Sequence, residues 1–128
     1  MSQYILDASA LLALLNGEKG GEQVEEAIAL GAAISTVNVA EVVSKLSDDG
    51  MPEIAIAQTL GLLGLEVVDF NRFLAYQTGM LRPLTKHRGL SLGDRACLAL
   101  ARVRNLPVLT TDRVWKDLSL DIIVRLIR

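Results

Sequence analysis

The sequence predicts an α/β fold: a three-layer α/β/α sandwich with a central, mainly parallel sheet of about five strands. Three observations lead to this prediction. Short runs of apolar and β-branched residues alternate with longer stretches of helical periodicity along the 128 residues. No linker, repeat or low-complexity tract interrupts the alternation, so we expect a single domain over residues 1–128. Parallel strands need crossover connections, and these are usually helices that cover both faces of a sheet.

The first half of the chain is predicted to contain two strands and four helices. Residues typical of turns separate them: Asn16 and Gly17 end the first helix, Gly31 ends the second, and Pro52 suits the start of the fourth. In order, we expect a strand at residues 4–6, helices at 8–15 and 21–30, a strand at 32–35, and helices at about 38–47 and 52–63.

The second half is predicted to contain three strands and two long helices. Pro83 lies inside the first of these helices and is expected to bend it. In order, we expect a strand at residues 65–69, a helix from 71 to 86 or 87, a helix at 92–104, a strand at 107–109, a helical turn at 112–116 and a strand at 122–124.

Composition disfavours a nucleic-acid-binding domain of the RRM or OB type. Aromatic residues make up 4% of the chain, too few for the base-stacking platform of an RRM or OB-type domain. The formal net charge of −2 gives no global positive field to hold nucleic acid nonspecifically. Any nucleic-acid partner must therefore be held locally or through metal ions.

The only cysteine and the N-terminal segment favour a cytoplasmic location. Cys97 lies in an apolar run, has no partner for an internal disulfide and is expected to be a buried small hydrophobe. The first apolar stretch is not preceded by Lys or Arg and carries Asp7 near its start, unlike a secretion signal. No apolar window is long enough to cross a bilayer.

Several common catalytic motifs are missing. The glycines between residues 17 and 21 have neither the GxxxxGK[ST] nor the GxGxxG spacing, and no serine lies in a GxSxG elbow. One histidine and one cysteine cannot build a zinc site. A phosphate-binding loop, a hydrolytic triad and a zinc centre are therefore all disfavoured.

Four carboxylates stand at the predicted carboxyl edge of the sheet. Asp7 and Asp112 directly follow the first and fourth strands, Glu41 lies in the first turns after the second strand, and Asp94 opens the helix before the fourth. In open α/β sheets the site lies at this edge. Acids that share a cleft repel one another unless cations lie between them, and hard oxygen ligands select Mg²⁺ or Mn²⁺. The pattern predicts a metal-dependent phosphoryl-transfer site.

Each acid also has a purely structural explanation, which is the better one when that acid is considered alone. Asp7 and Asp112 suit helix N-caps. Ser91 and Asp94 match a capping box. Glu41 is placed to pair with Lys45 one turn later on a solvated face. Only the joint placement of the four acids favours the metal site.

Four short segments resemble the PIN domain: YILDAS at residues 4–9, NVAEV at 38–42, SLGDRA at 91–96 and LTTD at 109–112. More narrowly, the short format is similar to VapC-type ribonuclease toxins of type II toxin-antitoxin modules. The resemblance implies that the family's acidic quartet corresponds to Asp7, Glu41, Asp94 and Asp112. It also implies that Ser9, Asn38 and Thr111 are auxiliary polar residues.

The resemblance implies an endoribonuclease that depends on Mg²⁺ or Mn²⁺. In the family, carboxylates hold one or two ions and metal-bound water attacks the phosphodiester. The resemblance further implies a homodimer and a small antitoxin, a segment of which occupies an apolar groove and projects a basic side chain into the acidic pocket. Apolar residues beyond one stripe at 10–15 and 54–63 suit such a partner, although two central helices packed on both sides would show the same pattern.

Five basic residues are candidates for holding RNA. Arg82, Lys86 and Arg88 form a local cluster upstream of Asp94, whereas Arg95 and Arg113 each adjoin one of the acids. The alternative is that the cluster complements a helix dipole before Gly89. His87 is left out of the site because it is equally suited to an exposed loop.

Two other functions compete with the nuclease. A receiver-like signalling domain also gathers acids around Mg²⁺, but it needs an acidic pair near the first strand, where only Asp7 is present, and a lysine after a late strand. A phosphotransfer assay separates this alternative. A noncatalytic PIN-like interaction scaffold usually lacks an acid, whereas this chain retains all four; metal titration separates that one.

Overall fold

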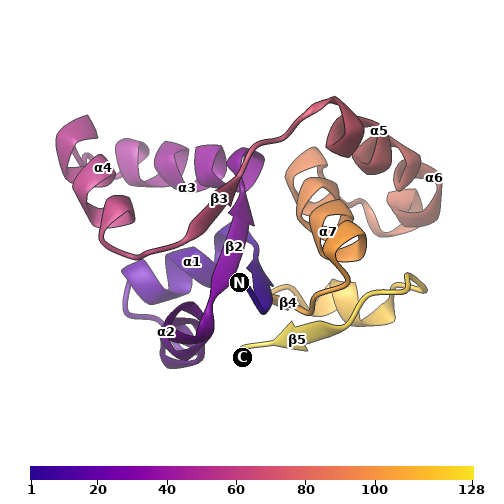
Figure 1. The fold of residues 1–128 in the computed structure, drawn as a ribbon, viewed down its shortest axis with the longest axis horizontal. Coiled ribbons are helices and arrows are strands. Elements are labelled where there is room, and N and C mark those ends of the chain that lie inside the picture. The colour runs from indigo at the N-terminus through magenta and orange to yellow at the C-terminus, as the bar shows by residue number, and fades with distance from the viewer.

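Five parallel strands form one sheet at the centre of the computed structural model, which describes residues 1–128 (Figure 1). Every neighbouring pair of strands is parallel, and the spatial order is β3-β2-β1-β4-β5. The strands are β1 (Tyr4–Leu6), β2 (Ala32–Ser35), β3 (Glu66–Val68), β4 (Val108–Thr110) and β5 (Val124–Leu126).

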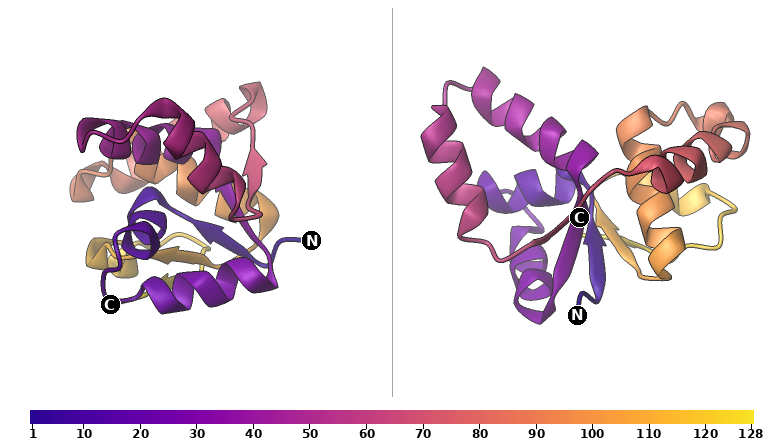
Figure 2. Two further views of the ribbon diagram at one scale, coloured as in Figure 1. Left: turned by 90° about the vertical axis from the view of Figure 1, so that its left-hand side faces the viewer. Right: turned by 45° about the horizontal axis from the view of Figure 1, so that its top comes forward.

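Helices cover both faces of the sheet. They are α1 (Ala8–Leu15), α2 (Gly21–Leu30), α3 (Thr36–Asp48), α4 (Glu53–Gly61), α5 (Arg72–Met80), α6 (Arg82–Thr85) and α7 (Leu92–Arg104), with 3₁₀ segments η1 (Lys86–Arg88) and η2 (Arg113–Asp117). The right-hand view of Figure 2 shows α1 to α4 on one side of the strands and α5 to α7 on the other. The predicted three-layer α/β/α class is confirmed. No helix has the length and apolar character required for a membrane span.

The two faces of the sheet carry separate apolar cores built mainly from aliphatic residues. Under α7, Leu98 and Trp115 pack with Ile5 of β1. On the other face, Leu6 of β1 packs with Val24 of α2. Successive residues of β1 thus point to opposite layers, as the pleat of a strand requires. Cys97 is fully buried in the first core, which confirms its predicted role as a small hydrophobe.

The bounds of β3, β4, α4 and η2 each differ from the sequence prediction by one or two residues, and three further differences have a physical cause in the structure. Helix α3 begins at Thr36 rather than at 38, since the Ser35 hydroxyl caps the Val37 N–H. The helix predicted from 71 to 87 is divided at Leu81, and Pro83 lies in the first turn of α6, where a missing N–H costs nothing. The last strand lies two residues later than predicted, because Val124 is the residue that pairs with Val108 of β4.

The strand order places a topological switch point between β1 and β4. From β1 the chain builds outward through β2 and β3, and it then returns to the other side of β1 as β4 and β5. Ligand sites of open α/β sheets lie at the carboxyl ends of the strands at such a point. Receiver domains have the order 2-1-3-4-5, so the receiver-like alternative is wrong for this fold.

Candidate active site

All four predicted acids line one cleft of about 430 Å³ at the carboxyl ends of β1 and β4. The three auxiliary residues predicted beside them line the same cleft. Its walls are formed by Asp7, Ala8, Ser9, Leu12, Asn38, Glu41, Asp94, Thr111 and Asp112. The structure therefore brings together side chains from α1, α3, α7 and the segment after β4, which are remote in the sequence.

Asp7 is the most deeply placed of these acids and is 5% exposed. As the N-cap of α1 it accepts the Ala10 N–H through Oδ1 at 2.8 Å. The Ser9 hydroxyl lies 2.8 and 2.9 Å from its two oxygens, and the Thr110 hydroxyl donates to Oδ2 at 2.6 Å. These donors hold the carboxylate in one orientation at the floor of the cleft.

Burial raises the pKa of Asp7 from its ordinary 3.8 to about 6. The hydrogen bonds from Thr110, Ala10 and Ser9 oppose this rise because they stabilise the charged form, and the negative charge of Asp94 adds to it. A carboxylate that is costly to ionise in the folded protein gains most from a nearby cation.

Thr110 is a residue that sequence reasoning missed. The prediction selected Thr111, whose backbone N–H donates to Ser9 Oγ at 3.0 Å. The hydroxyl of the preceding Thr110, fully buried at the end of β4, both donates to Asp7 and accepts the Asp112 N–H at 3.1 Å. Thr110 is the last residue of β4 and is buried, whereas Thr111 lies beyond the strand and is half-buried, a difference that the sequence does not reveal.

Asn38 connects α3 with α7 at the opposite wall. Its side chain is 1% exposed, and Nδ2 donates to Glu41 Oε1 at 2.7 Å and to the carbonyl of Gly93 at 3.0 Å. Asn38 Oδ1 accepts no hydrogen bond from the protein. A buried oxygen without a donor, in a residue that lines an acidic cleft, suits a cation or a water bound to one.

The capping explanation is correct for three of the acids. Besides Asp7, Asp94 completes a capping box with Ser91, and Asp112 accepts the Val114 N–H at 3.0 Å. Each of these last two caps uses one carboxylate oxygen, so Asp94 Oδ1 and Asp112 Oδ2 retain no protein partner. Capping therefore orients these acids and leaves an oxygen of each available to a ligand.

Glu41 is not explained by the structural alternative. Lys45, its predicted partner one turn later, pairs instead with Asp49 at 3.4 Å. Glu41 accepts from Asn38 through Oε1 only, and Oε2 has no hydrogen-bond donor. The predicted ion pair between Glu41 and Lys45 is therefore wrong.

The donor set of the cleft fits Mg²⁺ or Mn²⁺. It consists of hard carboxylate, amide and hydroxyl oxygens, and no Lys, Arg or His lines it to balance four acids. In this arrangement no three acidic side chains meet closely enough to enclose one ion. Glu41 is exposed and Asp94 and Asp112 are half-buried, so their side chains have room to turn toward a cation.

The five predicted RNA-binding cations lie outside the cleft. Arg82 and Lys86 belong to α6 and η1, and Arg113 begins η2; all three are exposed. Arg88 pairs with Asp117 at 3.2 Å, which joins η1 to η2. Arg95 donates to the Thr78 carbonyl at 3.3 Å and so links α7 to α5.

The two apolar segments noted in the sequence differ in burial. Helix α1 packs against α2, α3 and the sheet, which confirms the two-sided packing alternative for that helix. In α4 only Ile56 is buried, whereas Ile54 on the same helix is 73% exposed. A third apolar face, not predicted, lies on α5, where Phe73, Tyr76 and Met80 are 56 to 70% exposed.

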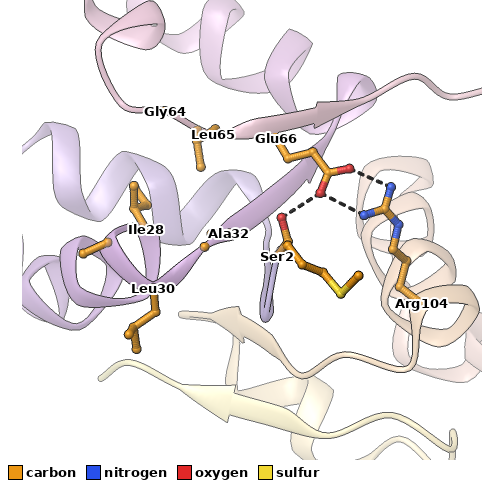
Figure 3. A pocket seen from close by; sticks show the side chains of 11 residues that line it. Ser2, Ile28, Leu30, Ala32, Gly64, Leu65, Glu66 and Arg104 are labelled. Carbon is orange, nitrogen blue, oxygen red and sulfur yellow. Dashed lines mark hydrogen bonds and ion pairs between the residues drawn. The ribbon is translucent and has the colours of Figure 1, made fainter.

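A larger hollow of about 620 Å³ lies at the amino-terminal edge of the sheet (Figure 3). Its polar groups are already satisfied within the protein. Glu66 accepts the Ser2 hydroxyl at 2.6 Å and two nitrogens of Arg104 at 2.8 and 2.9 Å. These bonds lower the pKa of Glu66, and the bond from Arg104 has a larger effect than the bond from Ser2. They also connect the N-terminus, β3 and α7. This edge is a structural junction rather than a candidate site.

Comparison with known proteins agrees with the fold. The PIN domain family model matches residues 4–120. No curated protein is significantly similar in sequence. Among solved structures, DNA-bound VapBC from Salmonella typhimurium has a TM-score of 0.79 at 21% identity and covers 100% of both chains.

Two further solved structures show the same likeness. VapBC2 from Rickettsia felis, bound to a fragment of its promoter DNA, has a TM-score of 0.76 at 21% identity and covers 96% of this chain and 97% of its own. VapC20 from Mycobacterium tuberculosis, a toxin that cleaves the sarcin-ricin loop, has a TM-score of 0.69 at 18% identity, with 86% and 90% covered. At these identities the likeness establishes a shared fold.

Proposed function

Because the chain belongs to the PIN-domain family, we propose that it is an endoribonuclease dependent on Mg²⁺ or Mn²⁺ and the toxin of a type II toxin-antitoxin module. One observation carries the proposal: four acids from four separate segments line one cleft that contains no cationic side chain. A structural role explains the position of each cap, but it does not explain why all four acids line the same cleft.

The proposed cation ligands are Asp7, Glu41, Asp94 and Asp112. A divalent ion held there would supply an activated water and stabilise the leaving oxygen of a cleaved phosphodiester. The protein's own contribution is orientation. The Ser9 and Thr110 hydroxyls orient the Asp7 carboxylate, Asn38 orients Glu41, and the caps orient Asp94 and Asp112.

RNA is proposed to reach the cleft along the basic residues beside it. Exposed Arg82, Lys86 and Arg113 are free of ion pairs with the protein, whereas Arg88 and Arg95 are partly engaged by Asp117 and Thr78. We therefore assign the larger share of phosphate contacts to the first three. Charge reversal at one of them should weaken RNA binding and reduce its dependence on salt.

The proposed partners are a small antitoxin and a second copy of the chain. A toxin-antitoxin complex from Klebsiella pneumoniae shares this fold, with a TM-score of 0.75 at 21% identity. In this chain α4 shares an apolar cluster with α1, whose Leu12 lines the acidic cleft, and Ile54 of α4 is exposed. We assign the antitoxin to this face and the homodimer contact to the α5 face formed by Phe73, Tyr76 and Met80.

The decisive experiment uses purified protein freed of any partner. We expect it to cleave RNA in Mg²⁺ or Mn²⁺ and to stop when EDTA is added. Asp94→Asn should fold, abolish cleavage and relieve growth arrest caused by expression without the antitoxin. Cleavage that survives chelation would exclude the metal mechanism. A wild-type protein that binds Mn²⁺ weakly or not at all and cuts no RNA would favour the noncatalytic scaffold.

A further inference from the structure

Gly93, the second residue of helix α7, lies close to the carboxylate of Glu41. A Cβ built on Gly93 would lie 2.6 Å from Glu41 Oε1 and would overlap the rest of that carboxylate. The three atoms nearest to this position all belong to the Glu41 carboxyl group. The space that a side chain would take at residue 93 is therefore occupied by one of the acids of the cleft.

Asn38 binds the same carboxylate. Its Nδ2 donates to Glu41 Oε1 at 2.7 Å and to the Gly93 carbonyl at 3.0 Å. One buried amide thus binds both the carboxylate and the helix backbone against which the carboxylate rests. Gly93 and Asn38 together form a seat for Glu41 beside Asp94, the next residue of α7.

The glycine at this position is not explained by helix formation. Gly93 has no left-handed backbone angle, and glycine lowers helix stability relative to alanine. At Gly79, inside α5, a Cβ would meet nothing within 4 Å. Gly79 is therefore a control for the change from glycine to alanine within a helix, because a methyl group there would meet no other atom within 4 Å.

We propose that Gly93 is a positioning residue whose lack of a side chain lets Glu41 rest against α7, and that this seat sets the affinity of the cleft for a divalent cation. The inference rests on the proposed function. Glu41 is exposed and its carboxyl group ends a flexible side chain, so an added methyl group displaces the carboxylate rather than the backbone. The displaced acid leaves Asn38 and its neighbouring acids.

The test is a Mn²⁺ titration by calorimetry on the full chain, with folding checked by circular dichroism. Gly93→Ala should fold like wild type and raise the Kd for Mn²⁺ by about 10-fold or more, the usual effect of losing a group that orients a ligand. Gly79→Ala should leave the Kd unchanged. In a Glu41→Ala background, Gly93→Ala should have no further effect, because no carboxylate remains to be displaced.

The outcomes separate this inference from the function on which it rests. Wild-type protein that binds no Mn²⁺ would overturn both. Wild-type binding with an unchanged Kd in Gly93→Ala would overturn the seat alone, as would an equal loss of affinity in the Glu41→Ala background. A Gly93→Ala chain that fails to fold would show that the backbone gives way instead of Glu41, and this too would overturn the seat.

Discussion

Thr110 Oγ1 donates a hydrogen bond of 2.6 Å to Asp7 Oδ2, although 103 positions of sequence separate the two residues. They meet because β1 and β4 are adjacent and parallel, with Leu6 level with Leu109. The residue after β1 and the last residue of β4 therefore reach the same edge. Since Thr110 also accepts the Asp112 N–H, one hydroxyl orients two acids of the cleft.

Two substitutions at Thr110 distinguish the effect of its hydroxyl group from the effect of its side-chain shape. Thr110→Val should lower the free energy of unfolding by about 1.5 to 3 kcal/mol, since a hydrogen bond to a charged group is lost. It should also raise the pKa of Asp7 further, because the bond from Thr110 opposes the rise caused by burial. Carboxyl NMR titration measures this pKa. Thr110→Ser, which keeps the donor, is the control, and equal pKa values in all three proteins would contradict the assigned role.

The stability of the metal-free protein should depend on the ionisation of Asp7. Its folded-state pKa of about 6 exceeds the ordinary 3.8, so the folded protein holds a proton that the unfolded chain has released between these values. The free energy of unfolding should therefore fall as pH rises from about 4 to about 6, by about 3 kcal/mol in total. Urea titrations in EDTA measure this.

Asp7→Asn is the matching variant for that pH series. Its free energy of unfolding should lack the fall between pH 4 and 6, because residue 7 no longer titrates. The free energy of unfolding of the variant, relative to that of wild type, should therefore be higher at pH 7 than at pH 4. Parallel curves for the two proteins across this range would show that Asp7 ionises normally.

Capping and cation binding make different predictions for Asp112. Asparagine caps a helix about as well as aspartate, whereas alanine costs about 0.5 to 2 kcal/mol. Without metal, Asp112→Asn should melt at the same temperature as wild type or higher, since one charge of a repelling group is removed. With Mn²⁺ it should lose most of the stabilisation that wild type gains by binding the ion only when folded. If Mn²⁺ stabilises wild type and Asp112→Asn equally, Asp112 is a helix cap and not a metal ligand.

The two exposed apolar faces should be separable by mutation. Tyr76→Lys on α5 should convert the proposed dimer to a monomer, because it places a charge in the middle of the apolar stripe. Ile54→Lys on α4 should leave the dimer intact and weaken capture of the antitoxin. Light scattering after gel filtration measures the first, and co-purification with the neighbouring gene product measures the second. If Tyr76→Lys remains a dimer, the dimer contact does not lie on α5.

Local sequence signals predicted the elements whose ends are defined by their own residues. Helix α7 begins and ends as predicted, because the capping box of Ser91 and Asp94 and the turn at Asn105 are encoded within a few positions. Helices α1 and α2 likewise match. Prediction failed at β5, where pairing with β4 rather than local propensity decides which residues form the strand.

By itself, the sequence determined the fold class, the three capping acids and, through its resemblance to the PIN domain, which four acids to consider together. Only the tertiary structure showed that they line one cleft, that Thr110 rather than Thr111 supports Asp7, and that Glu41 rests on Gly93 instead of pairing with Lys45. The reason is physical. A cap satisfies backbone groups within three or four residues, whereas these contacts depend on strand register and on how closely two helices approach.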